Sequence, residues 1–255
     1  MSDIILSVKN LTVSLKSNKS IILKNVSFDL KAGEVLRIGG PNGSGKTTLL
    51  KIIMLQTADY IVQSGEVYLY PFSNKNILTF NEKEILKYRA AVGFVGQKDN
   101  YDGLNKVTIG DLIDDAISVS KLSKESVVSL FIKYFADNKR ITLKSIPSKL
   151  SGGEQRMVSI FLGLVCEGNS KLFIIDEPLN NLDFQNIMRV SDLLNDVHRD
   201  NSETGMIIVT HCKIITCINR QRELKDGVLE EQDSQYECHY CMGEPDCDSY
   251  YLKKK

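Results

Sequence analysis

The chain has 255 residues, of which 42% are hydrophobic and 25% are charged. Its lysine and arginine residues number 32, as do its aspartate and glutamate residues, so the formal net charge at pH 7 is zero. This balance excludes a general electrostatic attraction to nucleic acid or to an anionic membrane surface, and a chain of this length can bury a substantial apolar core.

The N-terminal half of the sequence begins with predicted strands. Its first residues, MSDIILSV, lack the basic start and the small-residue cleavage site of a secretory signal, so we expect a cytoplasmic location. Apolar residues alternate with polar ones in some segments and recur at helical spacing in others. These patterns predict strands at 11–15, 26–30, 33–40, 65–70 and 90–96, and helices at 46–55 and 81–90.

The second half begins with a mostly helical stretch at 108–137, which we interpret as a small insertion. The longest strongly apolar run, at 157–166, has ten residues, about half of the roughly 20 that a membrane-spanning helix needs. Alternating strands and helices predict an α/β fold with a mostly parallel sheet that is covered on both faces. The remaining predicted elements are a helix after 154, strands at 171–176 and 206–211, a helix at 184–199 and a hairpin at 222–231.

A phosphate-binding loop is predicted at 40–48, GPNGSGKTT, which fits the pattern G-x-x-x-x-G-K-[ST] between a strand and a helix. Backbone N–H groups of such a loop turn toward phosphates, and the helix N-terminus adds a positive partial charge. Lys46 would reach the β and γ phosphates, and the Thr47 hydroxyl would ligate Mg²⁺. The predicted nucleotide-binding residues are Gly40, Pro41, Asn42, Gly43, Ser44, Gly45, Lys46, Thr47 and Thr48.

Polar side chains follow three apolar strands at the edge where ligands of parallel sheets collect. Asp176 and Glu177 end the segment LFIIDEP, and we predict that Asp176 holds Mg²⁺ while Glu177 orients and deprotonates the attacking water. Gln97 and His211 end two further strands, and each could reach a γ-phosphate. A carboxylate pair can also be solvated turn chemistry, and a lone histidine or glutamine is often structural, so these assignments depend on the phosphate loop.

The order of these motifs resembles that of the ATP-binding cassette (ABC) ATPase family over about residues 6–232. The order is the phosphate loop, Gln97, LSGGE at 150–154, IIDE at 174–177, NNLD at 180–183 and His211. The resemblance implies a P-loop NTPase (RecA-like) fold with an N-terminal antiparallel β subdomain and a helical subdomain at about 98–150. It also implies an ATPase domain over 1–235, followed by a cysteine-rich tail at 236–255.

The same resemblance implies a site shared between two cassettes packed head to tail. Ser151, Gly152 and Gly153 would be the signature motif that closes over the ATP of the partner, and Asp183 would communicate across the dimer. Gln97 would sense the γ-phosphate and Mg²⁺, and His211 would be the switch histidine. This sequence departs from the family at Leu15, where an aromatic side chain usually stacks on adenine, and at Glu154 and Met157 next to the signature.

The expected function is a Mg²⁺-dependent ATPase that powers a membrane transporter whose spanning subunits are encoded separately. Its partners would be an identical or different cassette and those spanning subunits, with no nucleic acid, at the inner face of the membrane. A soluble assembly ATPase, such as an iron-sulfur assembly cassette, is the alternative left open. DNA-repair cassettes are excluded, since only 105 residues separate Lys46 from Ser151 and leave no room for coiled-coil arms. Translation-factor cassettes, which carry two copies in one chain, are excluded as well.

Three of the six cysteines lie in the tail, where Cys238, Cys241 and Cys247 form a C-x₂-C-x₅-C arrangement around His239. The spacing of the first two is that of half a zinc knuckle, and the third could add a thiolate. A flexible terminus with free thiols is the other interpretation. The sequence leaves both open.

Overall fold

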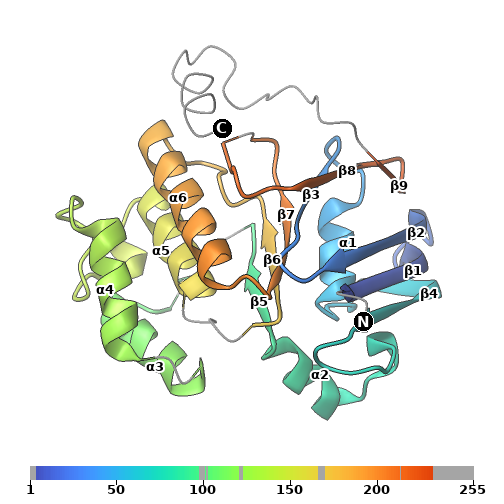
Figure 1. Cartoon of the computed structure of the whole chain (residues 1–255), viewed down its shortest axis with the longest axis horizontal. Coiled ribbons are helices and arrows are strands. Elements are labelled where there is room, and N and C mark those ends of the chain that lie inside the picture. Colours follow the sequence, from blue (N-terminus) through green and yellow to red (C-terminus); the bar gives the residue numbers. More distant parts are fainter. Residues whose placement is uncertain are drawn as a thin grey trace.

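The computed structural model describes residues 4–97, 101, 103–120, 123–165, 170–212 and 214–231. Its N-terminal part is a three-stranded antiparallel sheet in the order β2-β1-β4 (Figure 1). Buried and exposed residues alternate along β2, as they do in a strand with one covered face. The strands are β1 (Ile4–Leu15), β2 (Ile21–Lys31) and β4 (Tyr60–Leu69).

The second sheet has six strands in the order β5-β6-β7-β3-β8-β9, and all adjacent pairs are parallel except the β8–β9 hairpin. Every residue of β3, β6 and β7 is buried, because both faces of the sheet are covered. The predicted mostly parallel sheet and antiparallel N-terminal sheet are therefore confirmed. The strands are β3 (Val35–Gly39), β5 (Val92–Val95), β6 (Leu172–Asp176), β7 (Gly205–Val209), β8 (Arg220–Lys225) and β9 (Val228–Glu231).

The helices occupy the positions that the apolar spacing predicts, with small differences at their ends. Asn81 begins one of them with a reciprocal capping box to Glu84. The α-helices are α1 (Lys46–Ile53), α2 (Glu82–Arg89), α3 (Ile109–Ser120), α4 (Lys124–Phe135), α5 (Gly152–Val165) and α6 (Phe184–Asp200). Two 3₁₀ turns lie at Ile77–Thr79 and Pro147–Lys149.

Two apolar clusters cover the two faces of the six-stranded sheet. On one face, Leu36 and Ile38 of β3 pack with α1 and the antiparallel sheet. On the other face, Val35 packs with α5 and α6, and this cluster continues into α3 and α4 (Figure 1). Neighbouring residues of β3 thus point to opposite faces of the sheet.

The carboxyl ends of β3, β5, β6 and β7 meet at one edge of the parallel sheet. Strand β5 ends at Val95 and β7 at Val209. Gln97 and His211 therefore lie two residues beyond these strands, whereas the sequence analysis places them at the strand ends. The chain turns after β7, where the backbone N–H of Cys212 donates to the Thr210 hydroxyl at 3.1 Å. Among the described residues, no helix combines the length and the apolar character needed to span a membrane.

Candidate nucleotide site

The predicted phosphate loop joins β3 to α1, and its shape depends on glycine. Gly45 is the N-cap residue of α1 with φ +106°, a left-handed conformation that is strained for other residues. Gly40 has φ +129°, and a Cβ atom there would lie 2.1 Å from the carbonyl oxygen of Leu224. The loop can therefore approach the neighbouring strand β8 only with glycine at position 40.

Lys46, the first residue of α1, folds back over this loop. Its Nζ donates to the carbonyl oxygens of Gly40 at 2.7 Å and Pro41 at 2.9 Å. Burial lowers the pKa of the Lys46 ammonium, while the carboxylates of Glu177 and Asp176 oppose that change. The ammonium group is thus held within the loop, next to the N–H groups that would receive a phosphate.

Asp176, the last residue of β6, faces the N-terminus of α1. Its Oδ2 accepts a hydrogen bond from the Thr47 hydroxyl at 3.0 Å, while its buried Oδ1 atom has no hydrogen-bond partner among the described residues. Burial raises the pKa of Asp176. A carboxylate, a hydroxyl and the nearby Gln97 amide oxygen are the hard oxygen ligands that Mg²⁺ prefers, and the unpartnered Oδ1 is suited to a cation. The residues present therefore fit this ion.

Glu177 follows Asp176 with φ +48°, and its backbone N–H donates to the carbonyl oxygen of Val209 at 2.9 Å. The carboxylate Oε1 lies 3.4 Å from Nε2 of His211. Burial raises the pKa of Glu177 to about 7, with Lys46 opposing the rise and Asp176 adding to it. A carboxyl group with a pKa near neutral pH is suited to act as a general base.

A cavity of about 370 Å³ brings most of the predicted residues together. His211 adjoins this cavity through Glu177. The signature residues 151–153 and Asp183 do not line it, as expected for residues that act on the nucleotide of a partner. The cavity is lined by Leu15, Ile22, Asn42, Gly43, Gly45, Lys46, Thr47, Thr48, Gln97, Asp176 and Glu177.

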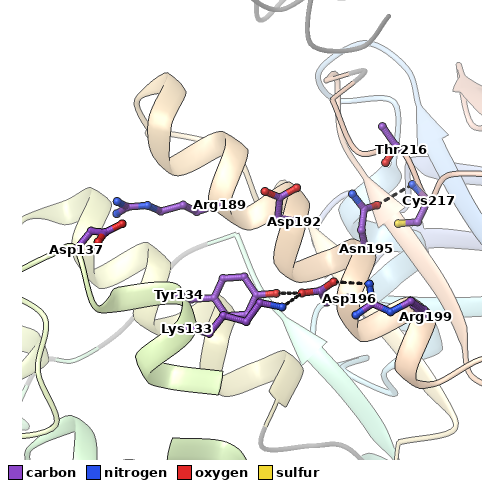
Figure 2. Close-up of a pocket in the computed structure, with 10 residues that line it drawn as sticks. All are labelled: Lys133, Tyr134, Asp137, Arg189, Asp192, Asn195, Asp196, Arg199, Thr216 and Cys217. Carbon is purple, nitrogen blue, oxygen red and sulfur yellow. Dashed lines mark hydrogen bonds and ion pairs between the residues drawn. The ribbon is translucent and has the colours of Figure 1, made fainter. Parts of the chain in front are cut away.

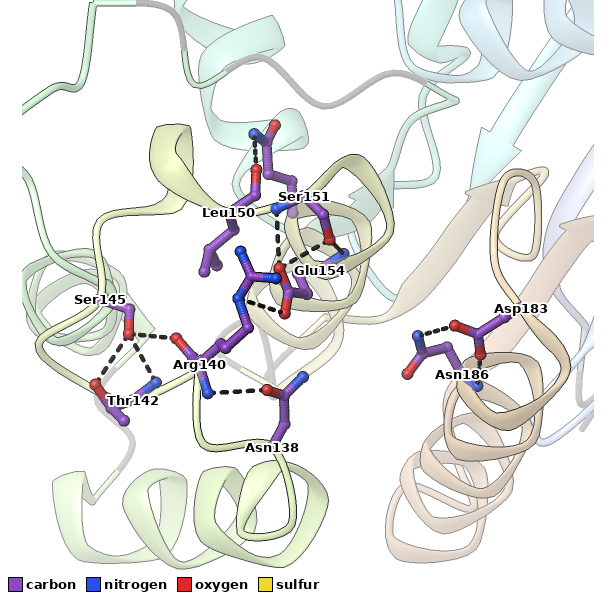
Figure 3. Close-up of polar contacts among 10 residues, drawn as sticks. Asn138, Arg140, Thr142, Ser145, Leu150, Ser151, Glu154, Asp183 and Asn186 are labelled. Carbon is purple, nitrogen blue, oxygen red and sulfur yellow. Dashed lines mark hydrogen bonds and ion pairs between the residues drawn. The ribbon is translucent and has the colours of Figure 1, made fainter.

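The signature motif forms the N-terminus of α5, where Ser151 and Glu154 bond reciprocally (Figure 3). The hydroxyl and the backbone N–H of Ser151 donate to Glu154 Oε2 at 2.8 and 2.9 Å. Arg140 lies 3.6 Å from the other carboxylate oxygen of Glu154. The departure from the family at Glu154 is therefore a capping-box partner of the signature serine. Asp183 likewise caps α6, because its Oδ1 accepts from the backbone N–H of Asn186 at 2.9 Å.

Arg156, which the sequence analysis does not single out, ties two parts of the site together. This residue of α5 is 3% exposed and donates to the carbonyl oxygens of Gly96 at 2.6 Å and Glu177 at 2.9 Å. One guanidinium group thereby joins the residue before Gln97 to the proposed general base. Its sequence signal is an arginine directly before the mostly apolar run MVSIFLGLV of the same helix.

Arg37 is a second buried cation absent from the sequence analysis. It is 2% exposed in the middle of β3, and its Nε donates to the carbonyl oxygen of Thr210 at 2.9 Å. Its Nη1 lies 3.4 Å from Oε1 of Gln221 on β8. The signal in the sequence is one charged residue in the otherwise apolar strand VLRIG.

A larger cavity, of about 690 Å³, lies between α4 and α6 and contains none of the predicted site residues (Figure 2). Lys133 and Tyr134 of α4 both donate to Asp196 of α6, so the cavity borders a polar link between the helical insertion and the core. Burial raises the pKa of the lining Cys217 thiol to about 12, which keeps it protonated.

Comparison with known proteins agrees with this geometry. The family model described as "ABC transporter" matches residues 23–180. The lipoprotein-releasing system ATP-binding protein LolD of Pseudoalteromonas translucida is 30% identical over 247 residues, which cover 92% of this chain and 99% of that protein. LolD of Francisella tularensis is 32% identical over 242 residues, which cover 90% and 97% respectively.

A solved structure is similar over the same region. It is the dimeric structure of a post-hydrolysis state of the ATP-binding cassette MJ0796, bound to ADP and Pi, a protein of Methanocaldococcus jannaschii. The TM-score is 0.72 at 27% identity, and the match covers 90% of this chain and 100% of that chain.

Proposed function

Since the chain belongs to the ABC transporter family, we propose that it binds ATP, hydrolyses it with Mg²⁺ as the required metal ion and powers a membrane transporter. The observation that carries this proposal is the single cavity where the phosphate loop, Asp176 and Glu177 meet. The soluble assembly alternative is less well supported, because relatives matched over nearly their whole length are named for a lipoprotein-releasing system.

The phosphate loop and Lys46 would hold the nucleotide. Phosphate oxygens would accept from the loop N–H groups at the N-terminus of α1 and from the Lys46 ammonium, which now donates to two carbonyl groups. Thr47, Gln97 and Asp176 would hold Mg²⁺, which when bound neutralises charge on the β and γ phosphates. The Leu15 and Ile22 side chains line the end of the cavity that would receive the base.

Glu177 would then act on water. Its carboxylate would orient the attacking water and take its proton as the bond from that oxygen to the γ-phosphorus forms. The bond between the γ-phosphorus and the β,γ-bridging oxygen breaks in the same step, and ADP leaves. His211, at 3.4 Å from that carboxylate, would contact the γ-phosphate from the other side. Arg156 holds the backbone carbonyl of Glu177 and so limits how far this base can move.

The signature residues would complete the site of a second cassette. Ser151 directly precedes α5, and Gly152 and Gly153 are its first residues, so the N–H groups of these glycines belong to the positive end of the helix. Their place outside the chain's own cavity supports a head-to-tail dimer, as does the dimeric state of the similar cassette. Asp183, the N-cap residue of α6, would communicate across that interface.

Subunits that span the membrane would receive the motion through the helical insertion, at about 98–150, and the stretch after Gln97. The chain would then be peripheral on the cytoplasmic face of the membrane.

We assign residues 1–235 to the ATPase domain. The tail at 236–255 lies outside the described residues, so zinc binding by Cys238, Cys241 and Cys247 stays a prediction, to be tested by the metal content of the full chain and of a chain truncated after Gln235.

The Glu177→Gln variant tests the proposed function. Removal of a positioned general base should lower the turnover of ATP about 10²- to 10⁴-fold while nucleotide binding persists. The control is Glu230→Gln on the exposed strand β9, which should hydrolyse ATP at the normal rate. Each protein is assayed with Mg²⁺ and with a chelator. Normal turnover of ATP by Glu177→Gln would contradict the proposal. Undiminished ATP turnover by the wild-type protein in chelator would contradict it as well.

A further inference from the structure

Arg37 occupies a costly position in the sheet. It lies in the middle of β3, between β7 and β8, and only 2% of the residue is exposed. A buried guanidinium group is destabilising unless its N–H groups meet hydrogen-bond acceptors. The acceptors that it reaches therefore indicate what this side chain does.

One acceptor is the carbonyl oxygen of Thr210, at 2.9 Å from Nε of Arg37. The pairing of β3 with β7 ends at Ile38 and Val209, so Thr210 is the first residue beyond it. Thr210 is 1% exposed, and a buried carbonyl group requires a donor. If the pairing of β3 with β7 continued, a backbone N–H group would donate to this carbonyl oxygen. The side chain of Arg37 supplies that donor instead.

The Thr210 carbonyl belongs to the peptide bond that leads into His211. The hydroxyl of Thr210 accepts from the backbone N–H of Cys212, so hydrogen bonds hold the residues on both sides of His211. His211 in turn lies 3.4 Å from Glu177. A change at Arg37 would reach the site through this turn.

Gly39 makes room for the guanidinium group. Residues 37 and 39 point to the same face of β3, and a Cβ atom at Gly39 would lie 2.7 Å from Nη2 and 2.9 Å from Nη1 of Arg37. The sequence thus combines a long cation with the smallest residue two positions later. This pairing fits a side chain that is accommodated for its hydrogen bonds.

We propose that Arg37 is a positioning residue for ATP hydrolysis, whose bond to the Thr210 carbonyl fixes the turn that presents His211 to the γ-phosphate. Arg37 itself does not line the nucleotide cavity, and its hydrogen bond reaches the site through the turn that carries His211. The inference rests on the role proposed above for His211.

A matched set of substitutions separates this role from simple packing. In Arg37→Gln, the amide nitrogen takes the place of Nε and can still donate to Thr210. Arg37→Met has the same reach without a donor, and Arg37→Leu is a second donor-free variant in case the first packs poorly. We expect the donor-free variants to lose on the order of ten- to a hundredfold in kcat, with the KM for ATP within about twofold of wild type. Arg37→Gln should keep at least about a third of kcat.

An imidazole signal gives an independent measurement. The chain has three histidines, and the NMR resonance of His211 is identified by its loss in His211→Ala. It should shift in Arg37→Met and stay in place in Arg37→Gln, while the resonance of His198 on α6 stays in place in both.

The outcomes distinguish this inference from the proposed function. If the donor-free variants equal or exceed Arg37→Gln in kcat, the hydrogen bond to the Thr210 carbonyl is not what Arg37 contributes, and the inference is wrong. Wild-type turnover by His211→Ala would contradict the proposed role of His211, and the inference would fail with it. Impaired His211→Ala together with full activity of Arg37→Met would overturn the inference alone.

Discussion

Glu177 combines a strained backbone with a buried acid, and the sign of its pKa shift gives a stability prediction. Its ordinary pKa of 4.5 rises to about 7 in the folded chain, so the folded state binds a proton more tightly than the unfolded state. Stability is therefore lost as the pH rises from about 4.5 to about 7. Glu177→Gln removes this effect, so the nucleotide-free variant should be more stable than wild type at pH 8, and the difference should vanish near pH 4.

Urea unfolding of both proteins without nucleotide measures this difference. Glu230→Gln, on an exposed strand, is the control and should have the wild-type stability at both pH values. A gain in Glu177→Gln that is equal at pH 4 and pH 8 would show that ionisation of Glu177 is not its cause.

Leu15 bears on which nucleotide base the site accepts. The cavity contacts Leu15 and Ile22 at the end of the antiparallel sheet, and none of the described residues that line it is aromatic. Apolar contact without stacking or a base-specific hydrogen bond gives little discrimination, so ATP and GTP should have KM values within a few-fold of each other. Leu15→Tyr should lower the KM for ATP about two- to tenfold, since an aromatic pair contributes about 0.5–1.5 kcal/mol. An unchanged KM would place the base elsewhere.

At the scale of elements, β3 carries the phosphate loop and has room for Arg37 only because residue 39 is glycine. Gly39→Ala would place a Cβ atom 2.7 Å from a terminal nitrogen of Arg37, and overpacking of this kind costs about 1–3 kcal/mol of unfolding free energy. Arg37→Gln should suppress the defect, because glutamine ends before the guanidinium group. The measurement is a double-mutant cycle of urea unfolding.

Gly152→Ala is the control for added volume, because a Cβ atom there meets no atom within 4 Å. It should leave the stability of the chain close to that of wild type. If Gly39→Ala is equally destabilising with arginine and with glutamine at position 37, the guanidinium group is not the source of the clash.

The elements around the site show which of its features could be predicted from the sequence. The phosphate loop, the strand-ending carboxylates and the signature are local patterns with fixed spacing, and they identify the site together with the order of strands and helices. Arg37 and Arg156 could not be found in this way, because they bond to the carbonyl groups of residues 173 and 60 positions away. The ends of β5 and β7 also differ from the prediction, since the strands end at Val95 and Val209, before Gln97 and His211.

At the scale of the whole molecule, the proposed head-to-tail dimer would make each chain supply half of each of two sites. Lys46 lies in the nucleotide cavity, whereas Ser151, directly before α5, lies outside it. If two cassettes share their sites, Lys46→Ala and Ser151→Arg should each be inactive alone, the first for lack of the ammonium group and the second because arginine blocks the approach of the partner.

Mixing the two inactive variants then tests the shared site. A mixed dimer contains one site built from an intact Lys46 of one chain and an intact Ser151 of the other, so up to about half of the dimers would regain one site of two, or about a quarter of the wild-type rate. The measurement is ATP turnover against mixing ratio, with a mixture of Lys46→Ala and Glu177→Gln as the control, since both changes damage the same half and should not complement. Normal activity of Ser151→Arg alone would contradict the composite site. Absence of recovery in the mixture would contradict a homodimer and point to a different cassette as the natural partner.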